Sequence, residues 1–391
     1  MSETLLAYQR STYAVWEITL KCNLACSHCG SRAGDARPNE LSTDEALDLV
    51  RQLDEAGVKE VTLIGGEAYL RKDWLEIAAE ITRRGMVCTV TTGGLGVSAH
   101  MAAKMKAAGI ASVSLSIDGL EATHDRLRGV PGSWNAAIRA LQHLREAGIQ
   151  IAVNTQINRR TWLELEALYE LLQPTGAHGW QVQLTVPMGN AADDSEVLLQ
   201  PYELLDLFPR LAALAERGRR EGFRMAAGNN VGYFGPYEGL LRSLGTQDAH
   251  WQGCQAGVST LGIEADGAIK GCPSLPTGPY TGANIRDLTL AQIIEQTEPL
   301  NFIRRKIADP SLATEDLWGF CKGCYYADVC RAGCNWTAHV FFGKRGNNPY
   351  CHHRALEQQA RGVRERLVQV AAAPGAPFDH GLFEIVEEPW G

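Results

Sequence analysis

The sequence lacks the features that mark several broad classes of protein. It has no apolar run approaching the roughly 20 residues of a transmembrane helix, and its first ten residues lack the basic, apolar and small-residue order of a signal peptide. Basic residues are in deficit, because 37 Lys and Arg face 45 Asp and Glu, for a net charge of −8. These absences predict a cytoplasmic protein with no membrane or nucleic-acid partner.

Cysteine is absent from a long central stretch, between residues 89 and 253. The 11 cysteines fall instead into an early and a late group, with Cys88 alone outside them. Structural disulfides are not expected in a reducing cytosol, and grouped cysteines at short spacings are typical of metal sites. With 45% hydrophobic and 21% charged residues, the 391-residue chain is otherwise typical of a globular protein.

Short apolar stretches alternate with amphipathic ones between residues 14 and 222. The apolar stretches, rich in Val, Ile or Thr, predict buried strands at Ala14–Leu20, Val61–Ile64, Val87–Thr92, Ser112–Ile117, Gln150–Ile157 and Trp180–Val186. Helices are expected between them, the first with a capping box at Ser42–Glu45. Six strand–helix units predict an α/β fold, a partial (β/α)6 TIM-like barrel with its chemistry at the carboxyl ends of the strands. Periodicity alone leaves a doubly wound open sheet as an alternative.

The pattern changes after about residue 224, where Gly, Pro and Cys become frequent and long helices are sparse until about Ala355–Val370. We therefore expect an N-terminal extension at 1–13, the barrel at 14–224 and a cysteine-rich domain of little regular structure at 225–371. Cysteine-bound metal would supply the order that such a domain otherwise lacks. The acidic residues 372–391 are expected to form a frayed C-terminal tail.

The early group, Cys22, Cys26 and Cys29, directly follows the first predicted strand. Three thiolates at this spacing can hold three irons of a cubane and leave the fourth iron open. A zinc site is the alternative, but it requires four ligands, and His28 lies inside the triplet. The CxxxCxxC pattern resembles that of the radical S-adenosylmethionine (SAM) superfamily. The resemblance implies a [4Fe–4S] cluster whose open iron chelates SAM, with His28 at an aromatic position of the loop.

Further segments fall where that resemblance requires them. Gly65, Gly66 and Glu67 end the second strand like the segment that receives the SAM ammonium, since glycines allow close approach and the carboxylate offsets positive charge. Ser116, at the end of the fourth strand, is implied as a ribose contact. Arg128 is implied near the SAM carboxylate, with a surface salt bridge as the alternative.

The late cysteine group resembles the seven-cysteine SPASM domain that follows the barrel in certain radical SAM enzymes. The resemblance implies one auxiliary [4Fe–4S] cluster closed by four thiolates, those of Cys321, Cys324, Cys330 and Cys351. A second auxiliary cluster is implied on only three thiolates, those of Cys254, Cys272 and Cys334.

The fourth position of the three-thiolate cluster is left open at this point. His250 or Asp248 could fill it, although a polar loop is the ordinary interpretation of both residues. An open iron could instead bind substrate. Cys88 is expected to be a buried apolar thiol on the third strand.

The resemblance implies an enzyme that reductively cleaves SAM to a 5′-deoxyadenosyl radical and oxidatively modifies a ribosomally made peptide or protein by crosslinking, decarboxylation or oxidation. It also implies an external flavodoxin-like or ferredoxin-like electron donor. Only about 13 residues precede the first strand, so a separate protein, or the clefts of this chain, is expected to recognise any leader peptide.

Two alternatives to this function are considered. One is a tetrapyrrole or haem-pathway side-chain oxidase or decarboxylase. The other is an iron–sulfur electron carrier without catalysis, against which the SAM-binding segments argue. No general base is identified, and the acidic residues of 193–196 and Tyr237-Glu238 are only candidates.

Overall fold

The computed structural model describes residues 12–243 and 249–391, and its main feature is one curved sheet of ten strands. The strand order is β10-β9-β8-β1-β2-β3-β4-β5-β6-β7. The parallel part contains β1 (Tyr13–Glu17), β2 (Glu60–Ile64), β3 (Val87–Thr92), β4 (Ser112–Ser116), β5 (Gln150–Ile157), β6 (Gly179–Leu184) and β7 (Arg224–Ala227). All six predicted strands are present. The seventh, β7, begins at the predicted domain boundary.

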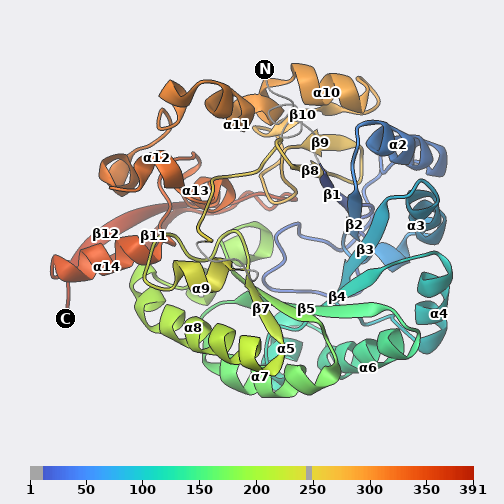
Figure 1. Cartoon of the computed structure of the whole chain (residues 1–391), viewed down its shortest axis with the longest axis horizontal. Coiled ribbons are helices and arrows are strands. Elements are labelled where there is room, and N and C mark those ends of the chain that lie inside the picture. The colour runs from blue at the N-terminus through green and yellow to red at the C-terminus, as the bar shows by residue number, and fades with distance from the viewer. Residues whose placement is uncertain (1–11, 244–248) are drawn as a thin grey trace.

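Helices cover the outer face of this curved sheet (Figure 1). They are α2 (Thr43–Glu55), α3 (Trp74–Arg83), α4 (Ala99–Ala107), α5 (Glu121–Arg128), α6 (Ser133–Glu146), α7 (Leu165–Leu172) and α8 (Leu204–Glu221). The predicted capping box at the start of α2 is formed, because the Ser42 hydroxyl accepts from the Glu45 amide and the Glu45 carboxylate accepts from the Ser42 amide. No pairing of β7 with β10 closes the sheet within the described residues, so the partial barrel is confirmed.

The C-terminal part continues the same sheet. Strand β8 (Thr260–Ile263) pairs parallel with β1, and β9 (Ala268–Lys270) and β10 (Thr281–Asn284) extend it antiparallel. The helices of this part are α9 (Glu238–Arg242), α10 (Leu290–Gln296), α11 (Glu298–Ala308), α12 (Ala327–Cys330), α13 (Asn335–Phe342) and α14 (His352–Ala360). Its elements are short, but they are more numerous than the Gly- and Pro-rich sequence indicated.

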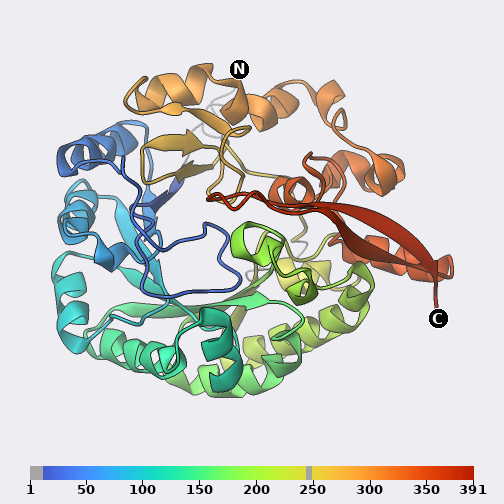
Figure 2. The ribbon, with the colours of Figure 1, turned by 180° about the vertical axis from the view of Figure 1, so that it is seen from behind.

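The predictions for the C-terminal end were wrong in two respects. The helix expected at 355–370 ends at Ala360, and Val363–Ala371 forms strand β11. The expected frayed tail contains β12 (Leu382–Pro389), which pairs antiparallel with β11. Burial of Leu367 and Phe383 in the main core explains the pairing, because a lone amphipathic strand cannot cover its apolar face. Figure 2 shows the turn of this hairpin reaching the middle of the molecule.

Within the described ranges, no helix has the length and apolar character needed to cross a membrane.

Candidate active site

The loop that carries the early cysteines crosses the mouth of the partial barrel at the carboxyl ends of its strands (Figure 2). There Cys22, Cys26 and Cys29 line a cavity of about 530 Å³. Every residue predicted to contact SAM lines the same cavity, namely His28, Gly65, Gly66, Glu67, Ser116 and Arg128. The fold therefore assembles the whole predicted site from β2, β4, α5 and the cysteine loop.

The early cysteines suit a cluster better than a single ion. The pKa of Cys22 is raised to about 12 and that of Cys26 to about 11, mainly by burial and in smaller part by the neighbouring thiols. Such thiols ionise readily only when metal cations join them. No three His, Cys, Asp or Glu side chains of residues 12–243 and 249–391 converge tightly enough to hold one metal ion. An iron–sulfur cube instead distributes its cysteines over separate irons.

The two glycines before Glu67 are required by close backbone approach. A Cβ atom on Gly65 would lie 2.3 Å from the Thr19 carbonyl oxygen, and one on Gly66 would lie 2.2 Å from that of Lys21. Because neither position has room for a side chain, the turn after β2 packs directly against the start of the cysteine loop. This contact fixes Glu67 relative to the cysteines.

The Glu67 carboxylate is buried and held by the turn after β3. It accepts hydrogen bonds from the Thr92 hydroxyl and, at 2.7 Å, from the Gly93 amide. Burial raises the pKa of Glu67 to about 7, although both hydrogen bonds and Arg128 oppose the shift. The Thr92-Gly93 turn, to which the sequence assigned no role, thus positions a predicted SAM contact.

Asp118 is a central residue of the site that sequence reasoning did not select, although it lies two residues after Ser116. It is fully buried, and its Oδ2 lies 3.1 Å from His28 Nε2 and 2.5 Å from Arg128 Nη2. Burial alone would raise the pKa of Asp118, but Arg128 and His28 hold it well below its usual range. Arg128 also reaches Cys26, with 3.7 Å between Nη1 and Sγ. Arg128 therefore forms an internal ion pair with Asp118 and not a surface salt bridge.

The late cysteines fall into the two sets that the sequence indicated. The pKa of Cys334 is raised to about 12, mainly by burial and in smaller part by Cys254 and Cys272, which therefore lie close to it. Cys272 in turn has its pKa raised to about 11 by burial and then by Cys254. The three thiols therefore form one neighbourhood.

The other four late cysteines form a second neighbourhood. The pKa of Cys351 is raised to about 12, mainly by burial and in smaller part by Cys321 and Cys324. Burial also raises the pKa of Cys330, with added effects from the other three members of the set. Four thiols that lie near one another, of which Cys321 is buried and the others are half-buried, fit a closed four-thiolate cluster.

A buried ion pair supports the four-cysteine set. Arg354 lies on α14 and its amide donates to Cys351 Sγ at 3.5 Å. Its guanidinium binds Glu365 of β11 through two hydrogen bonds of 2.6 and 2.9 Å, and both side chains are 3% exposed. The β11 strand is thereby tied to the cysteine neighbourhood.

Cys272 connects the three-cysteine set with the SAM-side cavity. It lines that cavity together with Pro273 and Ser274. These three residues follow β9 and do not lie at the strand ends that are predicted to bind SAM. It also lies near enough to Tyr13 of β1 to raise the pKa of that phenol, after the larger effect of burial. One cavity is therefore shared by cysteines of both groups.

Asp248 and His250 are the two candidates for the fourth ligand of the three-thiolate cluster. Asp248 lies outside the described residues. His250 is exposed, and its ring lies 5.8 Å from that of Phe234, which stacks on Tyr326. The Tyr326 amide donates to Cys324, so these contacts put His250 beside the four-cysteine set.

The candidate general bases are occupied in ion pairs away from the cavity. Asp193 pairs with Arg32 at 2.6 Å and Asp194 with Arg160 at 2.5 Å. Glu238 is buried and accepts from the Tyr233 and Trp251 amides, beside Arg242. Glu196, which is 86% exposed, lies 3.8 Å from Arg159, and Tyr237 stacks on His352.

Cys88 is fully buried in the core, as expected.

The turn of the C-terminal hairpin forms one wall of the cavity. Phe378 lines it, in the left-handed backbone region at φ 58°. The next residue, Asp379, accepts a 2.8 Å hydrogen bond from Arg32 Nε on the cysteine loop. The Gly189 amide donates to the Asp379 carbonyl at 2.8 Å. A segment predicted to be a tail thus contributes to the site.

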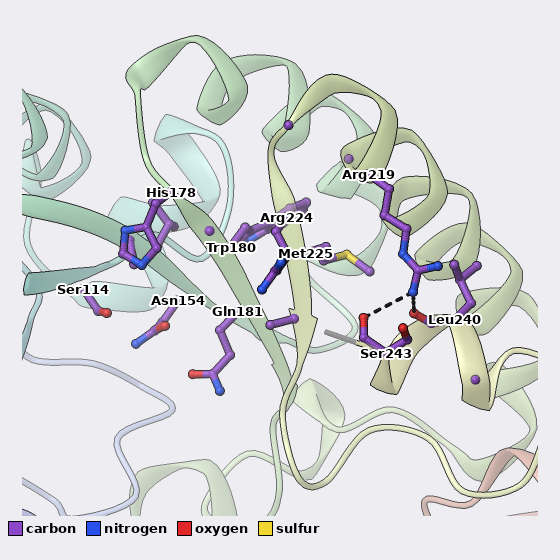
Figure 3. A pocket seen from close by; sticks show the side chains of 17 residues that line it. Ser114, Asn154, His178, Trp180, Gln181, Arg219, Arg224, Met225, Leu240 and Ser243 are labelled. Carbon is purple, nitrogen blue, oxygen red and sulfur yellow. Dashed lines mark hydrogen bonds between the residues drawn. The ribbon is translucent and has the colours of Figure 1, made fainter. Parts of the chain in front are cut away.

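A second cavity, of about 1090 Å³, opens near the amino-terminal ends of β6 and β7. Figure 3 shows Ser114, Asn154 and Gln181 on the sheet side of this cavity and Arg219 on the helix side, where it binds the carbonyls of Leu240 and Ser243. Asn154 and Gln181 line both cavities, so the two meet at these side chains.

Comparison with known proteins identifies relatives across nearly the whole chain. A family model described as Radical SAM superfamily matches residues 16–172. AdoMet-dependent heme synthase of Methanosarcina barkeri is 31% identical over 350 residues, which cover 87% of this chain and 95% of that protein. Mycofactocin maturase MftC of Mycobacterium ulcerans is 29% identical over 362 residues, covering 90% of this chain and 92% of that protein.

The fold is also similar to that of solved structures. The structure titled "Native anSMEcpe with bound AdoMet and Cp18Cys peptide" superposes with a TM-score of 0.68 at 16% identity, covering 88% of this chain and 94% of that one. At this identity the likeness concerns the fold alone.

Proposed function

The chain belongs to the radical SAM superfamily, among the enzymes with a C-terminal SPASM domain, and we propose that it oxidatively modifies a ribosomally made peptide or protein. The observation that carries the oxidative part is the shared cavity, which Cys22, Cys26 and Cys29 line together with Cys272. A substrate in this cavity would lie beside cysteines of both groups. That arrangement supports an oxidation in which the substrate would lose one hydrogen atom to the SAM-derived radical and one electron to a cluster held by the late cysteines.

Cys22, Cys26 and Cys29 would hold the [4Fe–4S] cluster that the superfamily implies. When bound, this cluster and SAM supply the 5′-deoxyadenosyl radical that removes hydrogen from an unactivated carbon. The chain's own residues bind and orient: Glu67 would receive the SAM ammonium, and Ser116 its ribose. Asp118 holds both His28 and Arg128 in place, and Arg128 would approach the SAM carboxylate.

Two auxiliary clusters belong to this proposal. The closed one would be held by Cys321, Cys324, Cys330 and Cys351, and the open one by Cys254, Cys272 and Cys334. The mutual proximity of the thiols within each set supports this division. We infer that the fourth position of the open cluster is free for another ligand, because the contacts of His250 lie beside the other set.

The peptide substrate is supported by relatives of similar length. Mycofactocin maturase MftC matches 92% of its own length, and the anSMEcpe structure is titled with a bound peptide. An external flavodoxin-like or ferredoxin-like donor would supply the electron.

A tetrapyrrole substrate is the second candidate. It is favoured by the 31% identity with AdoMet-dependent heme synthase over 95% of that protein's length. Side-chain oxidation or decarboxylation would use the same cavity and the same cysteines.

Anaerobic reconstitution tests these proposals. The reconstituted chain should contain roughly 12 irons, the content of three cubanes, and should release 5′-deoxyadenosine from SAM when reduced. Incubation with peptides encoded beside the gene, and separately with an iron porphyrin that carries carboxylate side chains, followed by mass spectrometry, distinguishes the substrates. A two-hydrogen loss from a peptide supports the first candidate, and a changed porphyrin side chain the second. Roughly four irons, or no cleavage of SAM, would contradict the three-cluster proposal.

A further inference from the structure

Glu17, the last residue of β1, is a buried carboxylate that the described site does not use. Alternate residues of β1 face the cavity, so Tyr13, Val15 and Glu17 line it while Ala14 and Trp16 pack in the core. Glu17 is 3% exposed, and no hydrogen bond within the described structure reaches its Oε1. A buried polar atom without a partner is unusual, and here it belongs to a cavity lined by cysteines of both groups.

The charges around Glu17 compensate its carboxylate only in part. Arg37 is the nearest cation, with 3.5 Å between its Nη2 and Glu17 Oε1. Arg37 donates its shorter hydrogen bonds elsewhere, to Glu264 at 2.9 Å and Asp266 at 3.2 Å. Lys270 Nζ likewise lies 2.7 Å from Glu264. Two cations therefore serve three carboxylates, and the contact of Glu17 with Arg37 is the longest of the three that Arg37 makes.

The protonation of Glu17 follows from this arrangement. The pKa of Glu17 is raised to about 8, mainly by burial and also by Glu264, while Arg37, Lys270 and a hydrogen bond from the Ala265 amide oppose the shift. A carboxyl group with such a pKa changes its protonation state close to neutral pH, which is the property that acid–base catalysis needs.

The cations are in turn covered by the turn of the C-terminal hairpin. Lys270 Nζ lies 4.2 Å from the centre of the Phe378 ring, and the Arg37 guanidinium carbon lies 5.7 Å from it. This aromatic cover excludes water from the far side of the cluster and leaves the cavity as the open side of Glu17.

We propose that Glu17 is a catalytic acid–base residue, whose Oε1 accepts the proton that the substrate releases in this cavity. The inference rests on the proposed oxidation, which removes one hydrogen atom and then one proton and one electron. The proton leaves an N–H, O–H, S–H or second C–H bond, whose electron pair forms the new bond of the product. It arrives on Glu17, and water later removes it. The electron goes to the iron–sulfur cluster proposed on Cys272 and its neighbours, so the Glu17 step itself changes no electron count.

This assignment separates the possible products. Crosslinking and oxidation release a proton and require an acceptor, whereas decarboxylation releases carbon dioxide in its place. Glu17 therefore assigns the reaction to crosslinking or oxidation.

The reconstituted holoenzyme tests the role of Glu17 in two ways. First, an infrared titration of chain labelled with 13C-glutamate, as the difference between wild type and E17Q, should show a carboxyl group ionising near pH 8. An ionisation near the ordinary value of a glutamate would overturn the proposal. This measurement needs no substrate, so it can overturn the proposal even if neither candidate substrate is modified.

The second test uses whichever of the two candidate substrates the wild type modifies. E17Q should lose product formation by a factor on the order of 10² or more, while 5′-deoxyadenosine release stays within about threefold of wild type. E17D should regain part of the lost activity and shift the pH profile of product formation. Glu60→Gln, at the start of β2 and outside the cavity lining, is the matched control and should behave as wild type. Product formation by E17Q at the wild-type rate would overturn the proposal.

Discussion

The turn of the C-terminal hairpin depends on one carboxylate, and we expect D379N to loosen it. Asp379 accepts from Arg32 Nε at 2.8 Å and from the Ala376 amide at 3.0 Å, and the side chains of the ion pair are 13% and 6% exposed. In the variant Arg32 keeps its 2.6 Å contact with Asp193, so its charge stays paired. The loss is then that of about one charge-assisted hydrogen bond, about 2 kcal/mol.

That loss corresponds to about a 30-fold increase in the undocked population of the turn. Hydrogen exchange followed by mass spectrometry measures it, as faster exchange across residues 372–381 and at the Gly189 amide, which donates to the Asp379 carbonyl. Glu384→Gln, on the exposed face of β12, is the control in the same hairpin. Equal exchange in D379N and E384Q would refute the view that the ion pair with Arg32 docks the turn.

Three further predictions concern stability, metal content and pH. E365Q leaves the buried guanidinium of Arg354 without its anion, so the free energy of unfolding should fall by about 3–5 kcal/mol in denaturant titrations, and a fall below 1 kcal/mol would contradict this. C351S should lose roughly four of roughly 12 irons by iron analysis, whereas C88S should lose none, and equal losses would contradict the division of the cysteines. The pKa of Glu17 is raised from its usual 4.5 to about 8, so the folded chain holds this proton more tightly than the unfolded chain does. The stabilising effect of this proton is complete below about pH 4.5 and is lost as the pH rises towards 8. Over that range the free energy of unfolding of wild type should fall by about 1 kcal/mol per pH unit relative to that of E17Q. A difference in denaturation midpoint that stays constant with pH would contradict this.

Features encoded in local sequence were predicted well. The strands of the barrel follow from apolar stretches, and the start of α2 follows from one capping box. The division of the late cysteines was implied by the resemblance to the SPASM domain and not by spacing, since Cys330 and Cys334 are close in sequence but were assigned to different sets. The structure brings Cys330 near Cys351 and Cys334 near Cys254.

Features that depend on distant partners were missed. The stretch now known as β11 has charges that suit a helix, and only its pairing with β12 makes it a strand. Phe378 enters the cavity because Asp379 meets Arg32, about 350 positions earlier in the chain, a contact no local pattern indicates. The sequence did contain an indication of Glu17, because a glutamate inside an otherwise apolar strand is rarely buried unless its charge is paired.

The pairing of β8 with β1 has a consequence for electron transfer. Trp16 of β1 and Ile263 of β8 are direct neighbours in the sheet, so backbone hydrogen bonds, and not a linker, join the two cysteine-bearing halves of the chain. The separation between the early and late cysteines is thus set by strand spacing, which changes little with thermal motion. Any tunnelling between centres held by these cysteines would proceed at a fixed distance and without gating by domain movement. Cutting the chain near residue 224 to isolate the barrel would also strip β1 of a neighbour and expose an unpaired strand edge.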